Sequence, residues 1–167
     1  MSWVKNKYIL LFLIFLLFLI DGQISYLLNS FLNYTVIISS QLFLAALLFM
    51  HRSKSSAFVI FTSVALGLLF DFYYLNHIGV VTLVLPSLSF FTAKLDSRYF
   101  INFFSNLVVY LIFVFFFNIF SYFLSFLYGF TAVSLPFFIT FNLAPTLVFN
   151  ILAFSFCRKA LKRLFLS

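Results

Sequence analysis

The positive charge of this 167-residue chain is confined to four short clusters. No Lys or Arg lies between these clusters, which are Lys5/Lys7, Arg52/Lys54, Lys94/Arg98 and Arg158/Lys159/Lys162/Arg163. Cationic side chains close to membrane-spanning segments stay on the cytoplasmic side. If the chain crosses a bilayer twice between successive clusters, all ten cations lie on one face. The charge pattern therefore predicts six spans with both chain ends in the cytoplasm.

The composition agrees with a lipid environment. The chain is 65% apolar and only 8% charged, whereas a soluble domain has about 45–50% apolar and about 25% charged residues. A soluble fold of this length has too little interior to bury so much apolar surface. The net charge of +7 then describes the cytoplasmic rim. It favours contact with anionic membrane lipids or an acidic partner, and it is poor evidence for nucleic acid.

Six apolar segments approach the length of about 20 residues that a membrane-spanning helix needs. They lie at 8–28, 31–50, 57–75, 78–93, 100–127 and 134–157. The fourth segment is short and contains Pro86, which removes a helix hydrogen bond. We therefore expect it inside the bundle or tilted against the third span. The sequence thus predicts an all-α, six-span helix bundle that forms a single polytopic membrane domain over residues 1–167.

Two of the three aspartates, Asp21 and Asp71, fall inside predicted spans. Counted along a helix, both lie about 20 Å from the cytoplasmic face. A charged side chain within a span costs at least about 2.5 kcal/mol near the membrane centre. We therefore expect both aspartates to face the protein interior with partners, or to be protonated. The role of Asp21 is not predicted.

For Asp71 the sequence offers a structural partner. It lies close to the end of the third span, and the turn that contains His77 and Gly79 returns the chain as the fourth span. The unpaired amides at the start of that span, together with His77, are therefore within reach of the carboxylate. We predict that Asp71 holds this hairpin together. The alternative is a role in binding a partner or a substrate.

A catalytic or metal site made of Asp21, Asp71 and His77 is the competing interpretation. The second histidine, His51, belongs to the opposite membrane face, which rules out a site with two imidazoles. Zinc catalysis usually takes three protein ligands and often two imidazoles. No nucleophile triad or glycine-rich phosphate loop stands out either. The sequence therefore predicts no cofactor and no enzymatic activity.

Polar residues in the last span form a second group. Asn142, Thr146 and Asn150 are spaced by four and share one helix face, and Pro145 lies beside them. Side chains of this kind join helices by hydrogen bonds within the membrane. Ser63 and Gly67 in the third span form a pair of small residues that allows close helix approach.

The basic end of the chain has an apolar face made by Leu161, Leu164 and Phe165. Its four cations lie largely away from that face. The pattern predicts a short amphipathic helix at the membrane interface, although control of topology by the charges explains it equally well.

Two stretches resemble the rod shape-determining protein MreD family. GLLFDFYYLNHIGVVTLVLPSLSFF begins at Gly67 and has that family's Gly-Leu-Leu, its membrane aspartate (Asp71) and a turn that ends in glycine (Gly79). APTLVFNILAFSFCRKALKR begins at Ala144 and is similar to the family's last span, with Pro145 and Asn150. Chain length and span number also agree. Asp21 matches no motif of the family.

The resemblance implies a non-enzymatic scaffold in a bacterial cell membrane, part of the machinery that elongates cell-wall peptidoglycan. Its expected partner is MreC, with MreB, a SEDS-family glycosyltransferase and a class B penicillin-binding protein as further partners. The implied fold is similar to the substrate-binding subunits of energy-coupling-factor transporters. The alternative is a small-molecule-binding or transport subunit with Asp21, Asp71, His77 and Asn142 around a pocket. The bulky residues of the first span argue against that alternative.

Overall fold

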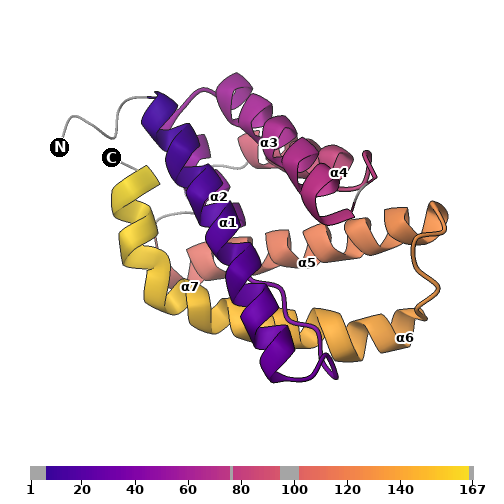
Figure 1. Cartoon of the computed structure of the whole chain (residues 1–167). Coiled ribbons are helices and arrows are strands. Elements are labelled where there is room, and N and C mark those ends of the chain that lie inside the picture. The colour runs from indigo at the N-terminus through magenta and orange to yellow at the C-terminus, as the bar shows by residue number, and fades with distance from the viewer. Residues whose placement is uncertain (1–6, 76, 95–101, 166–167) are drawn as a thin grey trace. The chain divides into compact units, whose positions relative to one another are not determined.

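A computed structural model of the chain describes residues 7–75, 77–94 and 102–165, and throughout this part the regular secondary structure is helical (Figure 1). The chain forms two compact units. The first comprises Met1–Ala46 and Val133–Ser167, and the second comprises Leu47–Ala132. Lys5, Arg98 and the third aspartate of the chain, Asp96, lie outside the described residues.

The first unit brings together the two ends of the sequence. Helix α1 is Lys7–Phe31, and helix α2, Leu42–Ser53, begins in this unit. Helix α6, Leu135–Phe138, passes through a π-helical turn, Ile139–Leu143, into α7, Ala144–Phe165. Together these last three elements form one apolar helix of 31 residues.

The second unit is built on the pairing of α3, Ser56–Phe70, with α4, Val81–Ala93. A π-helical turn, Asp71–Leu75, extends α3, and α5, Phe103–Leu127, packs against α4. Gly67 allows the close approach of α3 and α4. A Cβ atom at Gly67 would lie 2.7 Å from the Thr82 Cα and 3.0 Å from the Val81 carbonyl oxygen.

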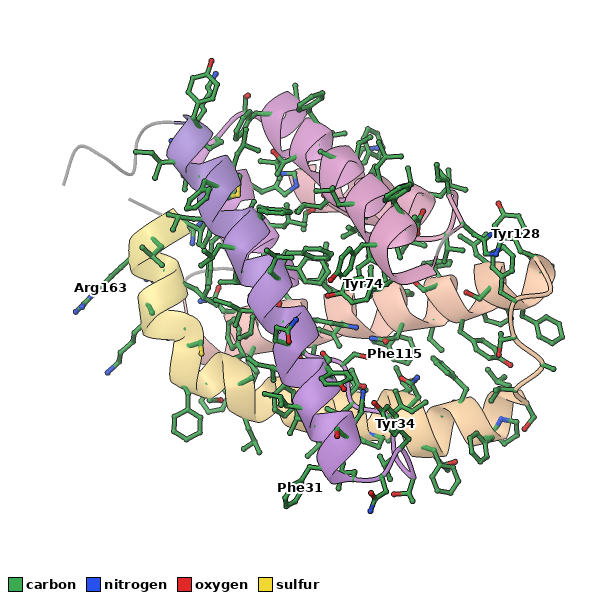
Figure 2. The ribbon with its side chains drawn as sticks, in the orientation of Figure 1. Phe31, Tyr34, Tyr74, Phe115, Tyr128 and Arg163 are labelled. Carbon is green, nitrogen blue, oxygen red and sulfur yellow. The ribbon has the colours of Figure 1, made fainter. Side chains whose placement is uncertain are left out.

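Among the described residues, four helices are long and apolar enough to cross a membrane: Lys7–Phe31, Ser56–Tyr74, Phe103–Leu127 and Leu135–Phe165. The other two, α2 and α4, are shorter, with 12 and 13 residues. Large apolar side chains cover much of the surface. Phe115, labelled in Figure 2, is 40% exposed, and Phe12 and Phe156 are 63% and 85% exposed. Such a surface suits a hydrocarbon environment.

The second predicted span differs most from the sequence-based expectation. A continuous helix was expected over 31–50, but the helix begins only at Leu42. Residues 32–34 form a turn in which Asn33 and Tyr34 have positive φ, and the chain then runs without regular helix to residue 41. The β-branched run Thr35-Val36-Ile37-Ile38 favours extended backbone over helix. High hydropathy does not distinguish the two conformations.

Within the described residues, the other predicted segments contain the helices α1, α3, α4, α5 and α6–α7. The last helix continues through Phe165, past the expected end at residue 157, so the amphipathic tail is a direct extension of α7. Pro86 lies inside α4, as its sequence position required.

Candidate functional site

One face of α1 carries a row of polar residues, Asp21, Ser25 and Asn29, each four positions after the last. This row faces the extended segment, which we define as residues 35–41. The Asn29 side-chain oxygen accepts a hydrogen bond from the Ile38 amide at 2.7 Å, and the Ser25 hydroxyl accepts one from the Ser40 amide at 2.8 Å. Two amides of the extended segment are therefore paired with side chains of α1.

The amides that alternate with these two are paired with the C-terminal part of the chain. Their acceptors all lie in the π-helical turn or in α7: Ile37 to the Phe141 carbonyl at 2.8 Å, Ser39 to Thr146 Oγ1 at 3.1 Å, and Gln41 to Asn150 Oδ1 at 3.0 Å. Asn150 also donates to the Ser39 carbonyl at 2.7 Å. Successive residues of an extended chain point in opposite directions. Odd-numbered amides therefore meet α7 while even-numbered amides meet α1.

Pro145 explains why a carbonyl of the π-helical turn is available to the extended segment. Proline has no N–H, so it cannot bond the carbonyl four residues earlier in a helix. In this chain that carbonyl belongs to Phe141, and it accepts the Ile37 amide instead. The Pro-Thr pair and the following asparagine thus act together, because Pro145, Thr146 and Asn150 serve alternate amides of one strand.

Asp21 completes the site at the start of α2. Its side chain is 2% exposed. One carboxylate oxygen accepts the Ser40 hydroxyl, and the other accepts the Phe43 amide at 2.7 Å. Amides in the first turn of a helix have no partner within the helix, and a negative group there is also favoured by the helix dipole. Asp21 therefore caps α2 and fixes the point at which the extended segment becomes helix.

Together these contacts pair the irregular backbone of the extended segment within the protein. Lipid offers no hydrogen bonds, so an extended chain at membrane depth must be paired within the protein. Every amide from Ile37 to Gln41 has such a partner. We call this arrangement, made by α1, α7 and the extended segment, the polar cradle.

In the second unit Asp71 makes a similar cap over a shorter distance in sequence. Its side chain is fully buried, and it accepts hydrogen bonds from the amides of Gly79 at 2.8 Å, Val81 at 2.8 Å and Thr82 at 3.0 Å. The last two amides belong to the first turn of α4. These are the backbone partners that the sequence proposes for a hairpin clamp.

The surroundings of Asp71 explain the two glycines and the histidine of the hairpin. Gly67 lies one turn before Asp71, so close approach and capping occur on the same face of α3. Gly79 has φ +125°, a conformation that side chains rarely adopt. His77 does not contact the carboxylate. It stacks on Phe130, with ring centroids 4.3 Å apart.

The position of Asn142 differs from the prediction, which placed it on one helix face with Thr146 and Asn150. It lies in the π-helical turn, where the bonding pattern is one residue longer than in an α-helix, so it leaves the line of the other two. Its side-chain oxygen is buried without a hydrogen-bond partner among the described residues.

Ser25, Asn29 and the extended segment were not among the site residues predicted from the sequence. The signal was present, because Asp21, Ser25 and Asn29 repeat at the same interval as Asn142, Thr146 and Asn150. The competing catalytic triad is not assembled within one unit, since Asp21 belongs to the first unit and Asp71 and His77 belong to the second. Within the described ranges no three His, Cys, Asp or Glu residues cluster to hold a metal ion.

An all-helical chain with long apolar helices, an aromatic surface and buried polar groups bonded to its own backbone is a membrane protein. The family described as rod shape-determining protein MreD matches residues 6–157. A cell shape-determining protein MreD of Streptococcus pneumoniae (strain ATCC BAA-255 / R6) is 35% identical over 134 residues, which are 80% of this chain and 81% of that protein. The chain therefore belongs to the MreD family, as the two sequence stretches indicated. No solved structure matches it.

Proposed function

We propose that this protein is a non-enzymatic, multi-pass scaffold of the rod-shape complex in a bacterial cell membrane. In this proposal it binds MreC and, through it or directly, the peptidoglycan-elongating machinery: the actin-like MreB, a SEDS-family glycosyltransferase and a class B penicillin-binding protein. The family membership supports the role in cell shape. The partners follow from what the family resemblance implies.

One observation carries the non-enzymatic part of the proposal. Both acidic side chains within the membrane helices are buried and bonded to backbone amides that start a short helix. A catalytic carboxylate must instead reach a substrate. Asp21 and Asp71 serve the architecture, which is what a scaffold requires.

The proposal keeps six crossings with both ends in the cytoplasm. The 12 residues of α2 span only about 18 Å. Residues 37–41, which contain no turn or bend, add about 16 Å. A crossing of about 30 Å is therefore within reach of this half-extended, half-helical segment. A reporter fused to the C-terminus should be active only in the cytoplasm, and activity outside the membrane would contradict the even number of crossings.

The alternative function, a small-molecule-binding or transport subunit, has less support. Such a site needs several polar groups that converge on a cavity. Of the four residues named for such a pocket, Asp21 and Asp71 already bond to backbone amides, and His77 stacks on Phe130. The expected likeness to substrate-binding subunits of energy-coupling-factor transporters stays a prediction of the family resemblance.

The partner hypothesis is tested by cross-linking in cells followed by purification of the tagged full chain. We expect a stable complex with a single-span protein that has an extracytoplasmic domain. The Asp71→Asn variant should lower folded yield or recovery of this partner, because an amide cannot accept three backbone N–H bonds as the carboxylate does. Ser87→Ala, an exposed change on α4, is the matched control and should behave as wild type. Recovery of only a free monomer from cross-linked cells would contradict the scaffold.

A further inference from the structure

Along one exposed face of α7, apolar side chains are followed by positively charged ones. Val148, Leu152 and Phe156 follow one another at intervals of four and are 60%, 56% and 85% exposed. Lys159 and Arg163, both exposed, continue the same line at intervals of three and four. Positions spaced in this way share one helix face. We call these five residues the α7 stripe: three apolar side chains followed by two cations.

The end of α7 is held in place by residues on its other side. Leu161 and Phe165 are 2% and 1% exposed. They anchor the last two turns against the protein, so the cations belong to a fixed helix. Figure 2 shows Arg163 pointing away from the ribbon, and Figure 1 shows the yellow end of α7 bent away from the line of α6.

The length of the helix places the two cations at the level of lipid headgroups. The 31 residues from Leu135 to Phe165 extend about 46 Å along the helix axis. The hydrocarbon layer is only about 30 Å thick. The excess lies at the basic end, whether it projects from the membrane or bends along its surface. Phe156 then marks the edge of the hydrocarbon, with Lys159 and Arg163 just beyond it.

We propose that the α7 stripe is a binding site for an anionic phospholipid of the leaflet that faces the basic clusters. The acyl chains lie along Val148, Leu152 and Phe156, and the phosphate bonds to Lys159 and Arg163. Arginine and lysine both bind phosphate, and the guanidinium group does so in a bidentate manner. An acidic protein would match the two cations but would have no use for the apolar residues that precede them. The site is independent of the scaffold proposal.

The test uses the purified full chain in a neutral detergent, titrated with phosphatidylglycerol and separately with phosphatidylcholine, with native mass spectrometry to count bound lipid. We expect wild type to bind phosphatidylglycerol in preference to phosphatidylcholine, and more weakly at high salt. The Lys159→Gln/Arg163→Gln variant should lose about tenfold or more in affinity for phosphatidylglycerol, because each surface cation strengthens binding to anionic lipid severalfold.

The control variant, Lys94→Gln/Lys162→Gln, removes the same net charge from two exposed positions off the stripe and should lose markedly less. Phe156→Ala should weaken both lipids, because it removes an acyl-chain contact. Thermal unfolding without added lipid verifies that each variant is folded.

Wild type with no preference for phosphatidylglycerol would overturn the site, and this result does not depend on any variant. So would equal losses in the two double variants. A stripe variant that binds lipid normally but no longer recovers an acidic protein from cells would also overturn it, and would assign the cations to that protein.

Discussion

The two aspartate caps of this protein solve the same problem at different distances along the chain. In each unit a long helix supplies a buried carboxylate to the first turn of a short helix, α2 with 12 residues or α4 with 13. Asp71 reaches amides that follow it by 8, 10 and 11 residues. Asp21 reaches residues that follow it by 19 and 22.

The difference lies in what each short helix needs besides its cap. The α3–α4 hairpin closes through a tight turn, and its clamp involves only its own residues. The extended segment before α2 depends also on Thr146 and Asn150, which lie 107 to 111 residues further along the chain. A self-contained hairpin can form before the rest of the fold, whereas the polar cradle requires both ends of the sequence.

The largest expected effect comes from Asp71→Ala, which leaves three buried amides without a partner. Each buried unpaired group costs about 1–3 kcal/mol, so we expect a loss of about 4 kcal/mol in the free energy of unfolding after local relaxation. Thermal or denaturant unfolding of the detergent-solubilised chain measures this loss. The free energy of unfolding of Asp71→Asn should lie between those of Asp71→Ala and wild type.

Cys157, the single cysteine of the chain, shows whether this damage stays local, because it belongs to the first unit. Under conditions where all proteins remain folded, Asp71→Ala should leave the rate of its reaction with a maleimide unchanged. Asp21→Ala should accelerate that reaction. Equal acceleration by both variants would mean that the two caps are not independent.

A slightly smaller effect is expected from Asn150→Leu, which tests the long-range half of the cradle. The change removes the partners of the Gln41 amide and the Ser39 carbonyl at a site with no exposed surface. We expect a loss of about 3 kcal/mol in unfolding free energy. Asn142→Leu, the same substitution two turns earlier, should be close to neutral, since the Asn142 oxygen has no partner among the described residues. Similar losses for both would show that polarity of the helix, rather than the specific bonds to the extended segment, matters.

Gly67→Ala should have an intermediate effect and tests the self-contained hairpin. Its new Cβ would meet backbone atoms of α4, which cannot rotate away as a side chain can. Overpacking of this kind costs about 1–3 kcal/mol, and we expect about 2 kcal/mol in thermal unfolding measurements. Gly129→Ala is the comparison, because its Cβ would meet nothing within 4 Å and only its φ of +74° is unfavourable. A larger loss at Gly129 would mean that backbone conformation outweighs helix approach.

The same contrast explains which parts of the structure the sequence reveals. The Asp71 clamp can be predicted, because the carboxylate, the turn and the start of α4 are close in the chain and helix starts always need partners. His77 was assigned to the wrong partner, since a nearby imidazole bonds a carboxylate or stacks on a ring with similar ease. Phe130, on which it stacks, lies in the loop after α5.

The polar cradle was harder to predict for a physical reason. Hydropathy reports the transfer of side chains into lipid and says nothing about whether the backbone is helical or extended. An extended backbone becomes acceptable only when partners from elsewhere pair its amides. Spacing by four identified Thr146 and Asn150 as a polar face, but it did not identify the strand they bind. The π-helical turn that displaces Asn142 leaves no clear trace in the sequence.

The smallest predicted effect concerns the C-terminal ends of the two short helices, α2 and α4. These ends also differ from each other. Exposed Lys94 follows α4, and its ammonium lies 4.5 Å from the centre of the Phe90 ring. Near the end of α2, His51 is half-buried, and neither ring nitrogen has a hydrogen-bond partner among the described residues. Burial lowers the pKa of His51 from 6.5 to about 4.

This pKa shift has a definite sign. Below about pH 6.5 the unfolded chain takes up a proton at His51 that the folded chain does not bind until about pH 4. Stability should therefore fall as the pH drops through that window, by about 1–2 kcal/mol once solvent screening of the partly exposed ring is allowed for. Thermal unfolding at about pH 7.5 and about pH 5 measures the fall, and His51→Gln should reduce it. If wild type and His51→Gln lose stability equally, the acid sensitivity arises at other groups, and the buried imidazole does not distinguish α2 from α4.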